Sequence, residues 1–218
     1  VAGAIDDMDG LVGVAPGVNV HAVKVMDADG KGTTGAVVAA LDRIIANNKS
    51  SPDAEKIDHP IVINLSLGTD ITQAEDDGWM LMDEAVQGAI DAGAVVTVAA
   101  GNSGKDVKDF SPAHVGSALT VGSYGQSGGY SSFSNYGSTV DVVAPGENIE
   151  SLWGGPAIKT YSGTSIAAPH AAGAAALYLS NYPNATPSDV HDAIVNAASG
   201  SVTGPDGSSY GQLDVSTF

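Results

Sequence analysis

Apolar runs and amphipathic stretches alternate along most of this chain. The runs at 60–68, 94–102 and 118–124 are mostly apolar and rich in β-branched residues. Such runs are typical of strands that are buried on both faces of a parallel sheet. Two further runs, at 18–26 and 139–146, have the same character. All of these segments therefore predict strands.

Helical periodicity separates the predicted strands. The apolar spacing predicts helices at about 34–47, 79–93, 165–181 and 187–198. Polar residues at 27–32 and 48–59 predict a turn and a surface loop. Alternating strands and helices predict an α/β fold, a three-layer sandwich with a mainly parallel central sheet. Neither a repeat nor a linker interrupts the pattern, so we expect 1–218 to form one domain.

Composition narrows the class of protein. Hydrophobic residues make up 43% of the chain and charged residues 15%, which is typical of a folded globular protein. The net charge of −17 argues against nucleic acid as a partner. An acidic surface suits high salt, calcium binding or solubility, and composition does not separate these. There is no cysteine and no apolar run of membrane-spanning length, so we expect neither disulfides nor a membrane partner.

Small residues gather where the predicted strands end. Ser66, Leu67 and Gly68 close one buried run, and Ala99, Ala100 and Gly101 close another, just before Asn102. Small side chains at strand ends allow another backbone to approach, as a bound extended peptide requires. Tight turns between strands and loops would explain the glycines equally well.

Ser165 stands between a Gly-Thr turn and a predicted helix of very small residues, in the stretch YSGTSIAAPH. An ordinary helix cap would explain a serine there. However, an Asn102 amide and the N–H groups of a helix N-terminus are also the donors that a developing oxyanion needs. The two readings remain open on these residues alone.

Several segments together resemble one protein family. GTSIAAPH, VAAGNSG, NLSLG, SSFSNYGSTVDVVAPG and VGVAPGVNVHAVKVMDADGKG are similar to motifs of the subtilisin-like serine proteases and occur in the same order as in that family. The resemblance covers nearly the whole chain, down to YGQLDVSTF. It implies a subtilisin-like fold and a serine endopeptidase that is extracellular, monomeric when complete and without an organic cofactor.

The resemblance also implies roles for individual residues. Ser165 matches the nucleophile, Asn102 the side-chain donor to the oxyanion, and Thr164 a residue that assists the oxyanion site. The partner would be an extended polypeptide substrate. The residues matching its binding edges, pocket walls and pocket floor are Gly30, Lys31, Gly32, Ser66, Leu67, Gly68, Ala99, Ala100, Gly101 and Phe110. These walls are apolar and uncharged, so we expect a preference for apolar or aromatic residues before the cut.

One departure from the family concerns the other two catalytic residues. The family uses an aspartate in an Asp-Thr/Ser-Gly segment and a histidine in a His-Gly-Thr-His segment, and this chain contains neither. The sequence VAG at 1–3 follows that histidine directly in the family. We therefore expect a fragment that is inactive alone and needs the N-terminal segment of the same domain as its partner. The alternative is a non-catalytic relative that works as a peptide-binding module.

The sequence around the histidines of this chain does not indicate that any of them replaces the missing catalytic histidine. None belongs to a motif typical of a catalytic base, so all are predicted to be structural or surface residues. They are His21, His59, His114, His170 and His191.

Calcium is the one metal that the resemblance implies. Asp141 matches a carboxylate that binds structural calcium together with carbonyls of the segment from Gly116 to Ala118, and calcium prefers such oxygen mixtures. Asp6, Asp7 and Asp9 form a second, weaker candidate, for which a solvated acidic loop is the alternative.

Overall fold

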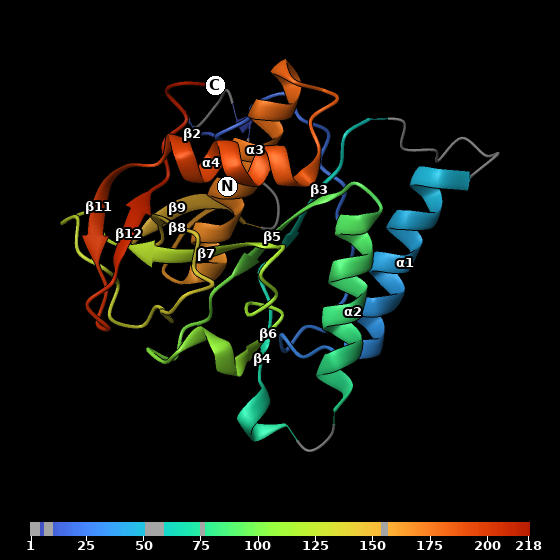
Figure 1. Cartoon of the computed structure of the whole chain (residues 1–218), viewed down its shortest axis with the longest axis horizontal. Coiled ribbons are helices and arrows are strands. Elements are labelled where there is room, and N and C mark those ends of the chain that lie inside the picture. The colour runs from blue at the N-terminus through green and yellow to red at the C-terminus, as the bar shows by residue number, and fades with distance from the viewer. Residues whose placement is uncertain (1–4, 7–10, 51–58, 75–76, 154–156) are drawn as a thin grey trace.

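The fold is built on one six-stranded sheet, seen in a computed structural model that describes residues 5–6, 11–50, 59–74, 77–153 and 157–218 (Figure 1). Its order is β11-β12-β8-β7-β5-β3. The strands are β3 (Val62–Leu65), β5 (Val95–Ala99), β7 (Leu119–Tyr124), β8 (Val142–Pro145), β11 (Ser199–Thr203) and β12 (Ser209–Gln212). All neighbours pair in parallel except β11 and β12, which are antiparallel.

Two helical layers cover the sheet. The helices are α1 (Thr34–Ser50), α2 (Gly78–Asp91), α3 (Thr164–Asn181) and α4 (Pro187–Ala197). Helices α1 and α2 lie side by side (Figure 1) and share one core with Val96 and Val98 of β5. Helices α3 and α4 share a second core with Val95 and Ala99 of the same strand. Successive side chains of a strand point to opposite faces, so the predicted three-layer arrangement is confirmed.

Helix α3 packs against the sheet through alanines. The side chains at 167, 168, 171, 174 and 175 are fully buried and belong to the core that α3 shares with β5, β7 and β8. Alanine has the highest helix propensity, and its small side chain lets the helix axis approach the sheet closely. The helix that carries Ser165 is therefore held firmly at the centre of the molecule.

Several short elements were not predicted from the sequence. They are the antiparallel pairs β1 (Ile5–Asp6) with β2 (Leu11–Val12), β4 (Thr69–Asp70) with β6 (Phe110–Ser111), and β9 (Ile149–Trp153) with β10 (Ala157–Tyr161), and the 3₁₀ turns η1 (Ile71–Gln73) and η2 (Val107–Asp109). Of these, β4 and β6 bear on the site because β4 follows the predicted wall at 66–68 and β6 begins at Phe110, the predicted pocket floor.

The strand predicted at 18–26 is wrong. Residues 18–25 pair with no strand of the described chain, and Met26 makes one isolated bridge to Gly32. Val20 and Val23 are 71% and 48% exposed. The segment has strand-forming residues, but a strand also needs a neighbour to accept and donate its backbone hydrogen bonds.

The loop predicted at 48–59 begins later than expected, because α1 continues to Ser50. Residues 51–58 of that loop lie outside the described residues. No helix in the described part of the chain is both long and apolar enough to cross a membrane.

Candidate active site

Two predicted pocket walls lie next to each other because β3 and β5 are neighbours. Leu65 of β3 is paired in register with Val98 of β5. The chain continues from these positions into 66–68 and 99–101, so both segments leave the same carboxyl edge of the sheet. Open α/β sheets bind ligands at this edge.

Ser165 lies at the start of α3, where its hydroxyl meets the end of β3. It is the second residue of the helix, which begins at Thr164. The residue before the helix, Gly163, has a φ of +154°. Its Oγ donates to the Ser66 carbonyl at 3.3 Å, and the Ser66 hydroxyl donates to the Ser165 carbonyl at 2.8 Å. These two bonds tie the serine to a predicted substrate-binding edge.

The Asn102 side chain is oriented by Thr164. Asn102 Oδ1 accepts hydrogen bonds from the Thr164 N–H at 2.8 Å and from Thr164 Oγ1 at 2.9 Å, and Oγ1 accepts one from the Gly101 N–H at 3.0 Å. Since a backbone N–H can only donate, the oxygen of the amide must face Thr164. The amide nitrogen of Asn102 is therefore left to donate elsewhere.

Two donors without partners thus lie close together at the start of α3, because a Cβ built on Gly163 would lie 3.6 Å from Asn102 Nδ2 and 3.8 Å from the Ser165 nitrogen. Within the described residues, neither Asn102 Nδ2 nor the Ser165 N–H has a hydrogen-bond partner. The first N–H groups of a helix have no partner within the helix and attract negative charge. The arrangement has the composition of an oxyanion hole, with one side-chain donor and one backbone donor.

Asn135 holds the loop that carries Asn102, and the sequence patterns gave it no role. Its fully buried amide donates to the Ala100 carbonyl at 2.8 Å and accepts from the N–H groups of Ser103 and Lys105 at 3.0 and 3.1 Å. Gly101 has a φ of +103°, and a Cβ there would collide with this amide. Asn135 lies in the SSFSNYGS stretch, which carried the resemblance but indicated no function.

The pairing of β4 with β6 brings Gly68 close to the segment that begins at Phe110. Strand β6 starts at Phe110 and pairs with Asp70 of β4, and Phe110 is only 7% exposed. The close approach of 2.8 Å between a Cβ built on Gly68 and the Ser111 carbonyl leaves no room for a side chain. A Cβ on Gly101 would lie 3.6 Å from the Phe110 ring. The structure therefore brings Gly68, Gly101 and Phe110 together, and their role as a substrate pocket stays a prediction.

The turn with Gly30, Lys31 and Gly32 is well formed but not joined to these walls. Asp27 Oδ1 accepts from the Lys31 N–H at 2.9 Å, and the Asp27 N–H donates to the Lys31 carbonyl at 2.8 Å. No hydrogen bond within the described chain links this turn to 66–68. Its place opposite them across a substrate stays a prediction.

Comparison with known proteins identifies the family. A sequence model of the subtilase family matches residues 1–212. The chain belongs to this family. The resemblance noted in the sequence and the predicted fold class are both confirmed.

Relatives of this subtilase carry the names of proteases. The chain is 44% identical over 192 residues to an extracellular serine proteinase of Thermus sp. (strain Rt41A), covering 87% of this chain and 43% of the relative. It is 44% identical over 209 residues to alkaline serine exoprotease A of Vibrio alginolyticus, covering 95% of this chain and 36% of the relative. The chain therefore spans less than half the length of these relatives.

A solved structure agrees with the fold. The crystal structure of a cold adapted subtilisin-like serine proteinase superposes with a TM-score of 0.80 and 39% identity. The match covers 94% of this chain and 69% of that one.

Three histidines of this subtilase, His114, His170 and His191, have partners other than Ser165. His170 Nδ1 lies 2.9 Å from the Ile166 carbonyl of its own helix. His114 Nε2 lies 2.6 Å from Asp83 Oδ2, and its Nδ1 lies 3.0 Å from the Lys108 carbonyl. No histidine of the described chain contacts the Ser165 hydroxyl, whose bond goes to Ser66.

Burial makes His170 a source of pH dependence. Desolvation lowers the pKa of the His170 imidazole below its ordinary value, so the unfolded chain binds its proton more readily. We therefore expect stability to fall as pH drops from about 7.5 through the ordinary histidine pKa of about 6.5. His170→Gln should lose less stability than the wild type over this range in urea unfolding. Replacing the exposed His21 by glutamine is the control, and parallel curves for wild type and His170→Gln would contradict this explanation.

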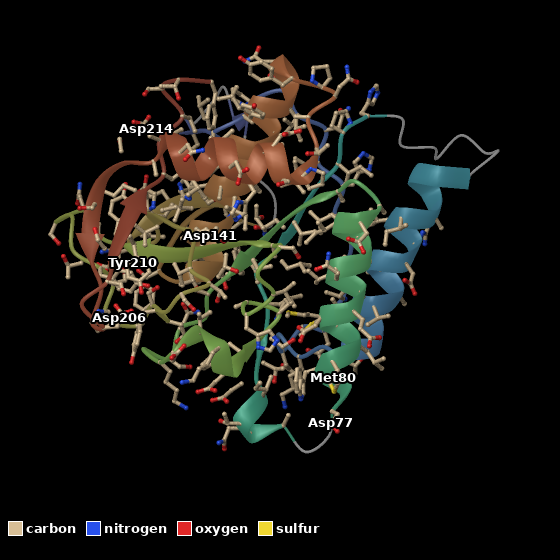
Figure 2. The ribbon with its side chains drawn as sticks, in the orientation of Figure 1. Asp77, Met80, Asp141, Asp206, Tyr210 and Asp214 are labelled. Atoms are coloured by element: carbon tan, nitrogen blue, oxygen red, sulfur yellow. The ribbon has the colours of Figure 1, made fainter. Side chains whose placement is uncertain are left out.

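Asp141, the predicted calcium ligand, lies between the sheet and α4 (Figure 2). Its Oδ2 accepts from the Thr120 N–H at 2.7 Å, and its Oδ1 lies 3.2 Å from His191 Nε2. The carboxylate, as hydrogen-bonding and charged partner, raises the pKa of His191. By distance and angle together Nε2 makes no hydrogen bond in the described chain, so its 3.2 Å contact with Asp141 is an ion pair when the imidazole is protonated.

The donor types fit calcium only if His191 moves. Thr120 follows the loop that carries the Gly116 and Ala118 carbonyls, so carboxylate and carbonyl oxygens lie in one region, as calcium prefers. A cation at Oδ1 would have to replace His191 there. In the described chain, no three histidine, aspartate or glutamate side chains gather as a metal site. Asp7, Asp9 and the side chain of Asp6 lie outside the described residues.

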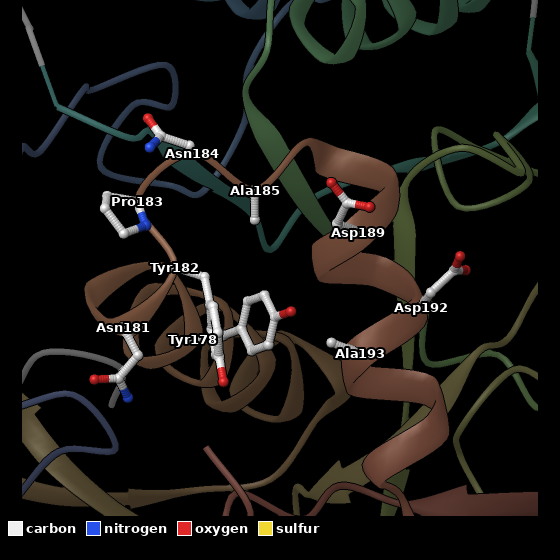
Figure 3. Close-up of a pocket in the computed structure, with 9 residues that line it drawn as sticks. All are labelled: Tyr178, Asn181, Tyr182, Pro183, Asn184, Ala185, Asp189, Asp192 and Ala193. Carbon is white, nitrogen blue, oxygen red and sulfur yellow. The ribbon is translucent and has the colours of Figure 1, made fainter.

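A hollow lies at the end of α3 that is far from Ser165. It has a volume of about 610 Å³ and lies between the end of α3 and the start of α4 (Figure 3). Tyr178 and Tyr182 stack there with ring centroids 4.6 Å apart, and Asp189 is engaged in capping α4 through Thr186. At about 1.5 Å per residue, most of the helix separates this hollow from the serine.

Proposed function

We propose that this subtilase is the nucleophile-bearing part of a serine endopeptidase. One observation carries the proposal: Ser165 lies at a helix N-terminus, and two donors without partners in the described chain, its own N–H and Asn102 Nδ2, lie close together beside Gly163. A module that only binds peptides has no need for an oxyanion hole. The protease names of the relatives support the same reaction.

The proposed reaction is acyl transfer through the serine. Ser165 Oγ attacks the carbonyl carbon of the scissile peptide bond and gives its proton to a base. The carbonyl oxygen becomes negative and accepts hydrogen bonds from the Ser165 N–H and Asn102 Nδ2, which stabilise the tetrahedral intermediate. The C–N bond then breaks, the amine leaves with the proton, and an ester remains on Oγ. Water hydrolyses the ester with the same base.

The base and the carboxylate that orients it are proposed to come from residues outside 1–218. The expected Asp-Thr/Ser-Gly and His-Gly-Thr-His segments are absent from the sequence, and His114, His170 and His191 have other partners. Without a base, Ser165 is an ordinary alcohol. We therefore propose that 1–218 needs the N-terminal segment of the domain for activity.

The proposed substrate is an extended polypeptide. It would lie between the edges at 30–32 and 66–68 and place an apolar or aromatic side chain between 99–101 and Phe110, residues that carry no charge themselves. We also propose an extracellular location, in line with the Thermus relative's name. A structural calcium at Asp141 with the Gly116 and Ala118 carbonyls would stabilise the loop before β7 by joining it to β8.

The test compares two proteins. One is the chain 1–218, and the other is the same chain extended at its N-terminus by a family segment that contains both missing motifs. Chromogenic peptides carry phenylalanine or arginine before the scissile bond. We expect the extended protein to cleave the phenylalanine peptide preferentially, and 1–218 to be slower by about 10⁴-fold or more.

Each other result has a definite meaning. Peptide binding without cleavage by the extended protein would favour the peptide-binding module. Efficient cleavage by 1–218 would show that a base lies within the chain. Equal cleavage of both peptides would contradict the assignment of the apolar pocket.

A further inference from the structure

Asp83 of α2 has a partner on each of its two carboxylate oxygens. Ser111 Oγ donates to its Oδ1 at 2.6 Å, and His114 Nε2 lies 2.6 Å from its Oδ2. The Asp83 and His114 side chains are each 19% exposed, and Ser111 is fully buried. Hydrogen bonds to a charged group are strong, and more so where water is largely excluded. Helix α2 is thus attached through Asp83 to the segment that starts with β6, which lies beside it (Figure 1).

His114 extends this attachment to the other side of Phe110. Its Nδ1 lies 3.0 Å from the Lys108 carbonyl, and its backbone N–H donates to the Phe110 carbonyl at 2.9 Å. A carbonyl only accepts, so Nδ1 must donate there, and the contact of Nε2 with Asp83 is strongest when the ring is charged. Trp79 of α2 packs edge-on against the ring, with centroids 5.7 Å apart. The chain is therefore held both before and after Phe110.

Helix α2 is a firm support for this carboxylate. Met82 and Val86, on either side of Asp83 in the sequence, are buried in the core that α2 shares with β5. Close-packed cores resist displacement of their side chains. Asp83 and its two partners therefore hold the segment 108–114 against a part of the molecule that lies outside the predicted pocket.

The held segment supplies two surfaces of the predicted pocket. A Cβ built on Gly101 would lie 3.6 Å from the Phe110 ring, and one built on Gly68 would lie 2.8 Å from the Ser111 carbonyl. These approaches are so close that the segment has little room to move toward either glycine. A movement away from them would change the shape of the pocket at Phe110.

We propose that Asp83 and His114 are positioning residues for specificity: they hold Phe110 in the pocket floor and thereby set the preference for a large apolar side chain before the scissile bond. Neither side chain touches the substrate. Without the carboxylate, the Ser111 hydroxyl and the His114 ring lose a partner while partly buried, and the segment moves to find another. A ligand then has to order the floor as it binds, which weakens binding. The inference rests on the proposed function, because it concerns the specificity of the same pocket.

The test measures the binding of two product-like peptides to the extended protein by isothermal titration calorimetry. The peptides are identical except that one ends in phenylalanine and the other in alanine, whose side chain is too short to reach the floor. We expect the wild type to bind the phenylalanine peptide at least about tenfold more tightly. Asp83→Leu should lower this ratio by about fivefold or more, mainly by weakening the phenylalanine peptide.

Two variants of α2 serve as controls. The amide of Asp83→Asn has an oxygen to accept from Ser111 and a nitrogen to donate to a neutral His114 ring, so the ratio should stay within about twofold of the wild type. Asp91 is an exposed carboxylate of the same helix that accepts from Gln87 Nε2 at 2.8 Å. Asp91→Leu removes a comparable bond far from Phe110 and should leave both affinities unchanged.

Two further variants keep the test decisive if Asp83→Leu does not fold. Ser111→Ala and His114→Phe each remove one partner of Asp83, and His114→Phe keeps a ring beside Trp79. Both should lower the ratio in proteins that thermal unfolding shows to be folded.

Four results would overturn the proposal. They are an unchanged ratio in Asp83→Leu or in both further variants, an equal loss for the two peptides, an equal loss in Asp91→Leu, and a wild type without preference for phenylalanine. Failure of the proposed function is a different result: it is a wild type that binds the phenylalanine peptide more tightly but cleaves no peptide.

Discussion

Ser165→Ala in the extended protein is expected to abolish acylation by a fluorophosphonate probe and to lower peptide hydrolysis by about 10⁴-fold or more. The substitution removes the one atom that is proposed to form the ester. It should change stability little, because the hydroxyl makes a single long bond of 3.3 Å to the Ser66 carbonyl, and one such bond is worth about 1 kcal/mol. Mass spectrometry of the labelled protein and its thermal unfolding measure both effects.

Ser188 offers a matched control. It is the second residue of α4, as Ser165 is of α3, and it is exposed. Ser188→Ala should keep full labelling and full hydrolysis. Labelling that persists in Ser165→Ala would place the nucleophile elsewhere and remove the basis of the proposed function.

The central part of the fold was predictable because its signals are local. Strand β5 is buried at every position, and its nearly continuous apolar run indicates a buried strand without reference to any other segment. Gly93, with a φ of +98°, ends α2 as glycines often do after a helix. Such features depend on neighbours in the sequence, and hydrophobic pattern and turn chemistry reveal them.

Elements that depend on distant contacts were missed. Strands β11 and β12 are rich in serine and glycine, and they are held by Val202 and Tyr210, which face each other in register and are buried. The β9–β10 pair is exposed and carries Trp153 against Tyr161, with ring centroids 4.9 Å apart. The sequence of a single strand does not indicate either of these pairings.

The candidate site also contains residues with a local sequence signal and residues whose role depends on distant contacts. Ser165, Asn102 and Thr164 were predicted because they lie in motifs, and the structure joins Asn102 by hydrogen bonds to Thr164, the residue before Ser165. Asn135 was missed because its role consists of bonds to residues 30 to 35 positions away. The segment 18–26 was misjudged for a related reason, since propensity describes one strand and a ladder needs two.

Asn102→Ala in the extended protein is expected to lower kcat by about 10²–10³-fold with little change in KM, because its amide donates to the oxyanion of the transition state. The substitution also removes the acceptor of the Thr164 N–H and hydroxyl, so loss of structure must be separated from loss of the donor. Asn102→Asp does this, since it keeps an oxygen facing Thr164 and replaces the donating nitrogen by a second oxygen. We expect Asn102→Asp to lose activity at least as strongly as Asn102→Ala while unfolding at nearly the wild-type temperature. If Asn102→Asp instead kept the wild-type kcat, Asn102 would serve to hold Thr164 and the start of α3, and the oxyanion would need another donor.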